Sequence, residues 1–121
     1  MALPENVPLN ETVIWGHMAD VSAASSTFAY VPVRGKVIKV GSVLGGAITG
    51  ADAAMTTEIN GTAVTGGSFT VANASSAAGD VDSAVPTAAN AVNVGDAFEW
   101  VTDGASSTTA TLHCFAIIRH S

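Results

Sequence analysis

The sequence predicts an all-β domain, a jelly-roll-like antiparallel β-sandwich of about eight strands with an extended N-terminal arm. Three observations predict it. The 121-residue chain is 48% hydrophobic but only 6% aromatic, because small and β-branched residues, which favour pleated sheets, dominate the composition. Helix formers with long straight side chains are scarce. Turn signals separate short β-rich runs at the spacing typical of a two-sheet sandwich.

Residues 1–10 form the predicted arm, and residues 11–121 form a single domain. The arm contains Pro4 and Pro8 and has no hydrophobic periodicity, which is typical of an extended segment. It has neither a cationic start nor a continuous apolar run, so we do not expect a signal peptide. No apolar stretch approaches the roughly 20 residues of a transmembrane helix. The sequence therefore predicts a soluble domain without membrane contact.

The first half of the domain contains three β-rich runs. Residues 12–19 form the first run, which ends at a Ser/Ala cluster at 22–26. Runs at 27–33 and 35–44 follow. Because Pro32 lacks a backbone donor, the run at 27–33 is predicted to be an edge strand or to carry a bulge.

The middle of the chain predicts three short strands and a long connection. A strand at 54–59 leads into Asn60-Gly61, the strongest hairpin signal, since both residues tolerate the positive φ of a type I′ turn. Return strands are predicted at 62–65 and 68–72. Residues 73–90 hold few large apolar side chains and predict a long connection with at most one short helical turn.

Two final strands are predicted at 97–102 and 108–119. Alternation in the first places Phe98 and Trp100 together on a core face and Glu99 on the other. The second strand is apolar on both faces at 115–118, so its outer face is predicted to meet another layer of the domain or another subunit, and we expect a homotrimer. Its predicted inner face contains Leu112, Cys114, Ala116 and Ile118, and its outer face Thr111, His113, Phe115, Ile117 and Arg119.

Charge and cysteine content exclude several functions. With 10 acidic and 4 basic residues the net charge is -6, which would repel nucleic acid. The single cysteine, Cys114, excludes an internal disulfide and a multi-cysteine zinc site, and it favours synthesis in a reducing cytoplasm. No phosphate-binding loop is present, and Asp80 and Asp82 lack a calcium-loop pattern. We expect no metal and no cofactor, because the histidines show no metal-ligand spacing: His17, His113 and His120.

Two catalytic alternatives are weak, and we expect no enzyme. Cys114 and His17 could pair as nucleophile and base, but a thiol on an apolar strand face normally acts as a small, unreactive hydrophobe. Glu58 and Glu99 could serve as acid and base of a hydrolase, but nothing in the sequence brings them together.

Three of the four cations lie within six residues: Arg34, Lys36 and Lys39. On a regular strand Lys36 and Lys39 point to opposite sides, so no uniform patch is expected. The cluster is interpreted either as charge that protects a sheet edge or as Arg34 or Lys36 meeting an acidic partner surface.

Four segments resemble small proteins of tailed bacteriophages that are found with the capsid genes and decorate or cement the head. The segments are YVPVRGKV (30–37), INGTAVTGGS (59–68), AGDVDSAVPT (78–87) and VGD (94–96), and the similarity spans roughly residues 26–119. The resemblance implies a jelly roll that trimerises on the outer surface of the head and clamps neighbouring capsomers. It implies no catalytic residues.

The resulting hypothesis is a virion structural protein whose partner is the major capsid protein. The alternative is a carbohydrate- or receptor-binding module of a phage tail or adhesin, for which Trp15 and Tyr30 are candidate sugar-stacking residues. The candidate interface residues come from the arm, the basic cluster and the last strand: Leu3, Pro4, Val7, Pro8, Leu9, Arg34, Phe115 and Ile117.

Overall fold

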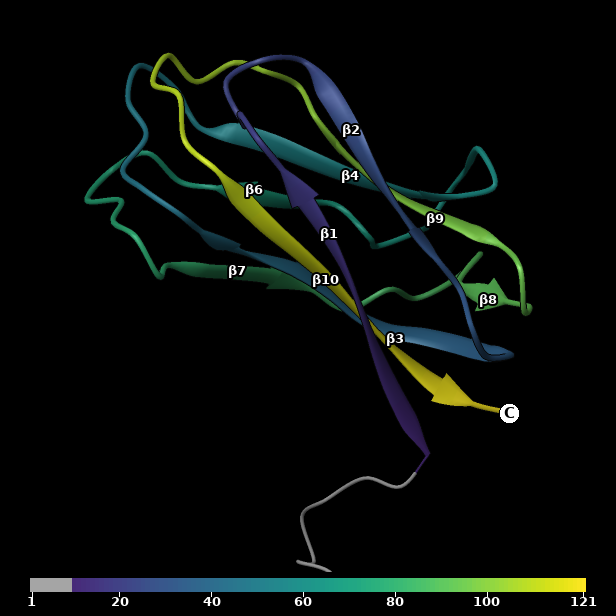
Figure 1. Cartoon of the computed structure of the whole chain (residues 1–121). Helices are drawn as coiled ribbons and strands as arrows, with labels where there is room; N and C mark the ends of the chain where they lie inside the picture. The colour runs from purple at the N-terminus through teal and green to yellow at the C-terminus, as the bar shows by residue number, and fades with distance from the viewer. Residues whose placement is uncertain (1–9) are drawn as a thin grey trace, which may run out of the picture.

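The computed structural model describes residues 10–121, which form two five-stranded antiparallel sheets packed face to face (Figure 1). Sheet A contains β1 (Glu11–Met18), β10 (Leu112–His120), β3 (Gly35–Leu44) and β7 (Val81–Ala84) in that order, and β8 (Ala91–Val92) also pairs with β3. Sheet B contains β2 (Ser25–Tyr30), β9 (Ala97–Thr102), β4 (Ala53–Ile59) and β5 (Thr62–Ala63), and β6 (Phe69–Val71) also pairs with β4. Between residues 10 and 121 no helix is long and apolar enough to cross a membrane.

The long strands follow the jelly-roll order. Along the chain β1, β3, β7 and β10 belong to sheet A, whereas β2, β4, β6 and β9 belong to sheet B, so the chain crosses repeatedly between the two layers. This alternation confirms the predicted sandwich. Residues 10–121 form ten strands, where about eight were predicted.

The prediction of a connection without strands at 73–90 is wrong. β7 lies inside it and pairs with Val40–Val43 of β3, and β8 follows shortly after and pairs with Gly35 and Lys36. Both strands are short, and Val81 of β7 is exposed, so neither produces the apolar alternation that marks a strand in sequence. Both segments form strands because their backbones pair with the backbone of β3.

Two local predictions on sheet B are confirmed. β2 ends at Tyr30, before Pro32, and lies at the edge of its sheet. Asn60 and Gly61 have φ of 50° and 84° and connect β4 to β5 as a two-residue hairpin. The Asn60 side chain also accepts a hydrogen bond from the backbone N–H of Ala97 and donates one to Asp96, which fixes the hairpin to the start of β9.

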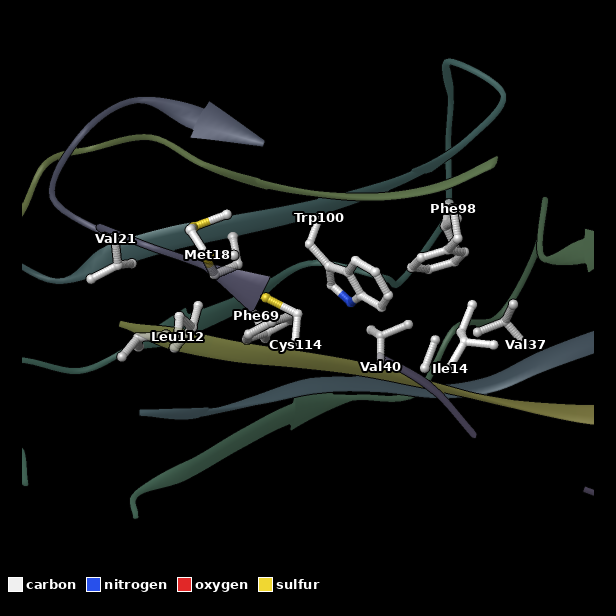
Figure 2. Packing of buried hydrophobic residues seen from close by; sticks show 14 of the residues in the cluster. Ile14, Met18, Val21, Val37, Val40, Phe69, Phe98, Trp100, Leu112 and Cys114 are labelled. Carbon is white, nitrogen blue, oxygen red and sulfur yellow. The ribbon is translucent and has the colours of Figure 1, made fainter. Parts of the chain in front are cut away.

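The core lies between the sheets and is centred on two aromatic residues of β9. Phe98 and Trp100 are fully buried, and their rings meet edge to face with centroids 4.8 Å apart. Figure 2 shows both rings reaching from sheet B toward Val40, Ile14 and Cys114 of sheet A. Aromatic rings of this kind remove roughly 150–250 Å² each from water. The prediction that Phe98 and Trp100 form part of the core is confirmed.

Trp100 also joins the two sheets through a hydrogen bond. Its indole Nε1–H donates to the backbone carbonyl of Phe115 in β10 at 3.1 Å. The ring lies so close to β1 that a Cβ placed on Gly16 would be 2.7 Å from it. Position 16 therefore admits only glycine without a shift of the ring.

Candidate functional site

The outer face of sheet A carries a row of apolar side chains that no other layer of residues 10–121 covers. Trp15 of β1 pairs with Phe115 of β10, and their ring centroids are 5.6 Å apart, while Val13 pairs with Ile117. Trp15 is 57% exposed and Val13 46%. We call the following six residues the apolar surface: Val13, Trp15, Val43, Val81, Phe115 and Ile117.

The Phe115 ring extends from β10 over β3. A Cβ placed on Gly41, which pairs with Phe115, would lie 2.7 Å from the ring atom Cζ. Val43 and Val81, which pair with each other across β3 and β7, continue the surface beyond it. The apolar surface therefore crosses β1, β10, β3 and β7. It satisfies the expectation that the second face of β10 is apolar, and within the described chain it has no covering layer.

A β-bulge gathers the cations at one end of this face. The register between β3 and β10 shifts so that Val37 pairs with Ile118 and Lys39 with Ile117, leaving Ile38 as the extra residue. Lys36 and Lys39 are both exposed and pair with Arg119 and Ile117, whose side chains lie on the outer face. The prediction that the two lysines point to opposite sides is therefore wrong, because the bulge reverses the alternation between them.

We call Arg34, Lys36, Lys39 and Arg119 the basic corner. They are all four of the lysines and arginines in the chain. Arg34 is exposed in the loop before β3, and Lys36, Ile38, Arg119 and His120 help to line a shallow hollow there. Arg119 forms an ion pair with Glu11 at 2.7 Å, and within residues 10–121 the other three cations have no carboxylate partner.

The outer face of sheet B differs in charge. Phe28 and Tyr30 on the edge strand β2 are 61% and 65% exposed, and Phe28 pairs with Glu99 of β9. Glu99 in turn pairs with Glu58 of β4. We call Phe28, Tyr30, Glu58 and Glu99 the acidic surface. Nothing in the sequence predicts that the two glutamates meet, but the register of β4 and β9 places them directly opposite each other.

The structure separates the two members of the first catalytic alternative, Cys114 and His17. Cys114 is fully buried, and burial raises the pKa of its thiol to about 12, whereas His17 is exposed on the opposite face of sheet A. A thiol–imidazole pair is therefore excluded, and the predicted burial of Cys114 is confirmed. His17 instead packs against His113, with ring centroids 5.1 Å apart. Within residues 10–121 no group of three or more metal-ligating side chains gathers.

Two aspartates outside the two outer faces, Asp96 before β9 and Asp82 in β7, have shifted pKa values. Asp96 accepts a hydrogen bond from the backbone N–H of Asn93 and one from Asn60, which hold the pKa of its carboxyl below the ordinary value. Asp82 pairs with the buried Ser42 at the edge of sheet A. Partial burial and the nearby charge of Asp80 raise the pKa of Asp82.

The predicted interface residues divide into two groups. Arg34, Phe115 and Ile117 lie on or beside the outer face of sheet A, as expected. The two candidate sugar-stacking residues do not form one platform, because Trp15 lies on sheet A and Tyr30 on sheet B. The candidates in the arm lie outside the described residues: Leu3, Pro4, Val7, Pro8 and Leu9.

No family model and no curated protein matches the chain. Among solved structures, one neighbour belongs to the cyanophage Pam1 capsid asymmetric unit, with a TM-score of 0.54 and 15% identity over 100% of this chain and 93% of that chain. Another is the catalytic unit of a thermostable GH87 α-1,3-glucanase from Streptomyces thermodiastaticus strain HF3-3, with a TM-score of 0.55 and 13% identity. That match covers 93% of this chain but only 26% of the glucanase unit. Both similarities establish the sandwich fold.

Proposed function

We propose that this chain is a structural protein of a phage virion that decorates the outer surface of the head. In this role it binds the major capsid protein, bridges adjacent capsomers as a homotrimer and catalyses no reaction. It is made in the cytoplasm of the bacterial host and ends on the outer capsid surface.

The observation that carries the proposal is the uncovered apolar surface on sheet A. The rings of Trp15 and Phe115 pack against each other at a tilt of 57° across β1 and β10, on a face that contributes nothing to the core between the sheets. Contiguous apolar surface of this kind marks a protein interface. The neighbour from the Pam1 capsid asymmetric unit supports the choice of a phage capsid, because the match extends over nearly the full length of both chains.

The charge distribution is consistent with a position on the outside of a shell. The chain carries a net charge of -6, which disfavours contact with a packaged genome. A protein that binds only the assembled lattice raises the free energy of disassembly by mass action. Many copies act together on one shell, so modest affinity at each site becomes large for the whole head.

The test uses purified heads of the parent phage that lack the protein. Added full-length chain is expected to sediment with the heads and to raise the temperature at which they open. The variant Trp15→Ser is expected to remain folded but to protect less. Failure of the full chain to sediment with heads at tens of micromolar overturns the proposal.

The contribution of the arm is tested separately. Residues 2–9 can be deleted while Asn10 is kept, because its carbonyl accepts a hydrogen bond from the backbone N–H of His120. We expect the shortened chain to fold and to bind heads more weakly, since an extended segment can lie along a neighbouring surface. Equal protection by the shortened and full chains would remove the arm from the interface.

A second candidate function is carbohydrate binding by the acidic surface. Phe28 and Tyr30 are exposed on one strand beside Glu99, and sugar rings stack on aromatic faces while their hydroxyls donate to carboxylates. The β-sandwich neighbour within the glucanase catalytic unit supports this reading. A glycan array probed with the wild type and with Phe28→Ala/Tyr30→Ala tests it. Binding by the wild type alone would favour this function over the first.

A further inference from the structure

We propose that the outer face of sheet A in one copy docks on the acidic surface of sheet B in a second copy. The inference rests on the homo-oligomer of the proposed function and identifies the two surfaces that form it. Both surfaces belong to this chain, so their chemistry can be compared directly.

Charge complementarity is the first argument. The chain has ten acidic residues and four basic ones, yet every lysine and arginine lies in the basic corner. Arg34, Lys36 and Lys39 have no carboxylate partner within residues 10–121. The face on the opposite side of the sandwich presents Glu58 and Glu99 side by side. Each charged face of one copy can therefore meet a face of opposite charge on a second copy.

The arrangement of glutamates is the second argument. Like charges placed directly opposite on neighbouring strands destabilise a sheet by roughly 0.2–1 kcal/mol, and Glu58 and Glu99 form such a pair without a cation beside them in residues 10–121. Docking of Lys36 and Lys39 from another copy would relieve this repulsion. The monomer carries an unfavourable pair that the proposed contact makes favourable.

The apolar content of the two faces is the third argument. The apolar surface contains Trp15 and Phe115, and the acidic surface contains Phe28 and Tyr30, so each face has exposed aromatic groups beside its charges. Interfaces are enriched in aromatic residues and use charge to fix their register. The two faces therefore match in both properties.

The dimensions of the faces are adequate for a specific contact. β10 has nine residues, about 30 Å at roughly 3.3 Å per residue. Four strands spaced by about 4.8 Å give a width of about 19 Å. The resulting area of about 570 Å² per copy, about 1,140 Å² for the pair, exceeds the roughly 1,000 Å² in total that a specific interface requires.

The number of copies in an oligomer depends on whether the contact joins identical or different faces. Contact between identical patches closes at two copies, whereas contact between unlike patches generates a ring when the rotation closes. A trimer therefore needs two different surfaces on each copy. The outer faces of sheets A and B are two such surfaces with opposite charge. Because they lie on opposite sides of the sandwich, repeated contact between them stacks copies, and closure at three copies further requires the two faces to be inclined to each other.

The test reverses each charge set and then both together, with mass measured by light scattering on the full chain at about 100 µM. Lys36→Glu/Lys39→Glu makes both faces acidic, and Glu58→Lys/Glu99→Lys makes both basic. Each double variant should raise the dissociation constant at least about a hundredfold, because like charges then face each other. The quadruple variant has both faces reversed and should recover the wild-type mass, a multiple of the 12.0 kDa of one chain.

Each alternative outcome contradicts the contact. A wild type that is monomeric under these conditions overturns it. If only the lysine variant dissociates, the acidic surface is not the partner, and if the quadruple variant stays monomeric, the charges do not face each other. Thermal unfolding by circular dichroism checks that each double variant is folded, with the quadruple variant as the control for all four positions.

Failure of this inference and failure of the proposed function are distinguishable. A wild-type monomer that still sediments with heads refutes the contact between copies and leaves decoration intact. A charge-dependent trimer that never binds heads refutes decoration and leaves the contact intact.

Discussion

Both faces of β10 contain apolar residues, four on the inner face and two on the outer face, and the two faces differ in what surrounds them. On the inner face Leu112, Cys114, Ala116 and Ile118 are completely buried between the sheets. On the outer face Phe115 and Ile117 are only half-buried, and their neighbour Trp15 is mostly exposed. The fold requires the first set, and no other layer of residues 10–121 covers the second.

This difference separates stability from association within one strand. Burial of the inner residues drives folding of the single chain, because it removes their surface from water. The outer residues gain little on folding and retain surface that a partner can bury. Substitutions on the two faces should therefore have different consequences although the residues are adjacent in sequence.

The largest expected difference is in chemical reactivity. Cys114 on the inner face has its pKa raised to about 12 by burial, which lowers the thiolate fraction about a thousandfold from that of an ordinary thiol with pKa near 9. A thiol reagent at pH 8 should label the native protein at least about a thousandfold more slowly than the denatured protein. The matched control is Cys114→Ala/Phe115→Cys, which places a thiol on the outer face and should react readily. Similar rates for the two thiols would contradict the difference between the faces.

The next largest effect is a difference in the free energy of unfolding between substitutions at two neighbouring isoleucines, one on each face. Ile118→Ala removes fully buried methyl groups and should lower the free energy of unfolding by about 2–4 kcal/mol. Ile117→Ala, on the outer face, should cost less than about 1 kcal/mol. Urea denaturation of both variants at a concentration where the protein is monomeric measures the difference. Equal losses would mean that the outer face also stabilises the single chain.

A smaller loss of unfolding free energy is expected at Gly16, where β1 packs most closely against the Trp100 ring. Gly16→Ala places a Cβ 2.7 Å from the Trp100 ring, and overpacking of this kind costs about 1–3 kcal/mol. The control is Gly46→Ala, because a Cβ at Gly46 meets nothing within 4 Å. Thermal unfolding should separate the two variants, and an unchanged transition for Gly16→Ala would show that the ring moves freely.

The smallest effect concerns the carboxylates outside both faces. The pKa of Asp96 is lowered below 3.8 in the fold, so its ionised form adds stability that is present above pH 3.8 and is lost as the pH falls through the folded pKa. Asp82 has a raised pKa, so its contribution has the opposite sign and stability is gained as the pH falls toward 3.8. The urea midpoint is measured between pH 7 and 2 for the wild type and both variants. As the pH falls, the midpoint should decrease less for Asp96→Asn than for the wild type, and more for Asp82→Asn.

Much of the fold could be predicted because local patterns specify it. Alternation placed Phe98 and Trp100 in the core and assigned the two faces of the last strand correctly. Asn60-Gly61 fixed the hairpin between β4 and β5, because few residues adopt positive φ. These features depend on neighbouring residues alone, so they can be predicted without knowing which strands pair.

The parts that were missed depend on pairing between distant segments. The bulge at Ile38 follows from the register of β3 against β10, and without that register Lys36 and Lys39 were assigned to opposite faces. The opposition of Glu58 and Glu99 likewise requires the register of β4 against β9. The sequence spacing shows that Arg34, Lys36 and Lys39 lie close together, but their common face and the acidic surface are products of topology.

The placement of the two tryptophans gives the protein separate optical reporters. The backbone carbonyl of Phe115 accepts the indole hydrogen bond of Trp100 inside the sandwich, while its ring packs on Trp15 outside. The buried indole emits from an apolar, water-free environment, whereas the exposed one emits at longer wavelength and is open to quenchers such as iodide. Unfolding changes the emission of both indoles. A partner seated on the outer face of sheet A would protect Trp15 from iodide and leave Trp100 unaltered, so the native chain reports folding and docking through different parts of one fluorescence spectrum.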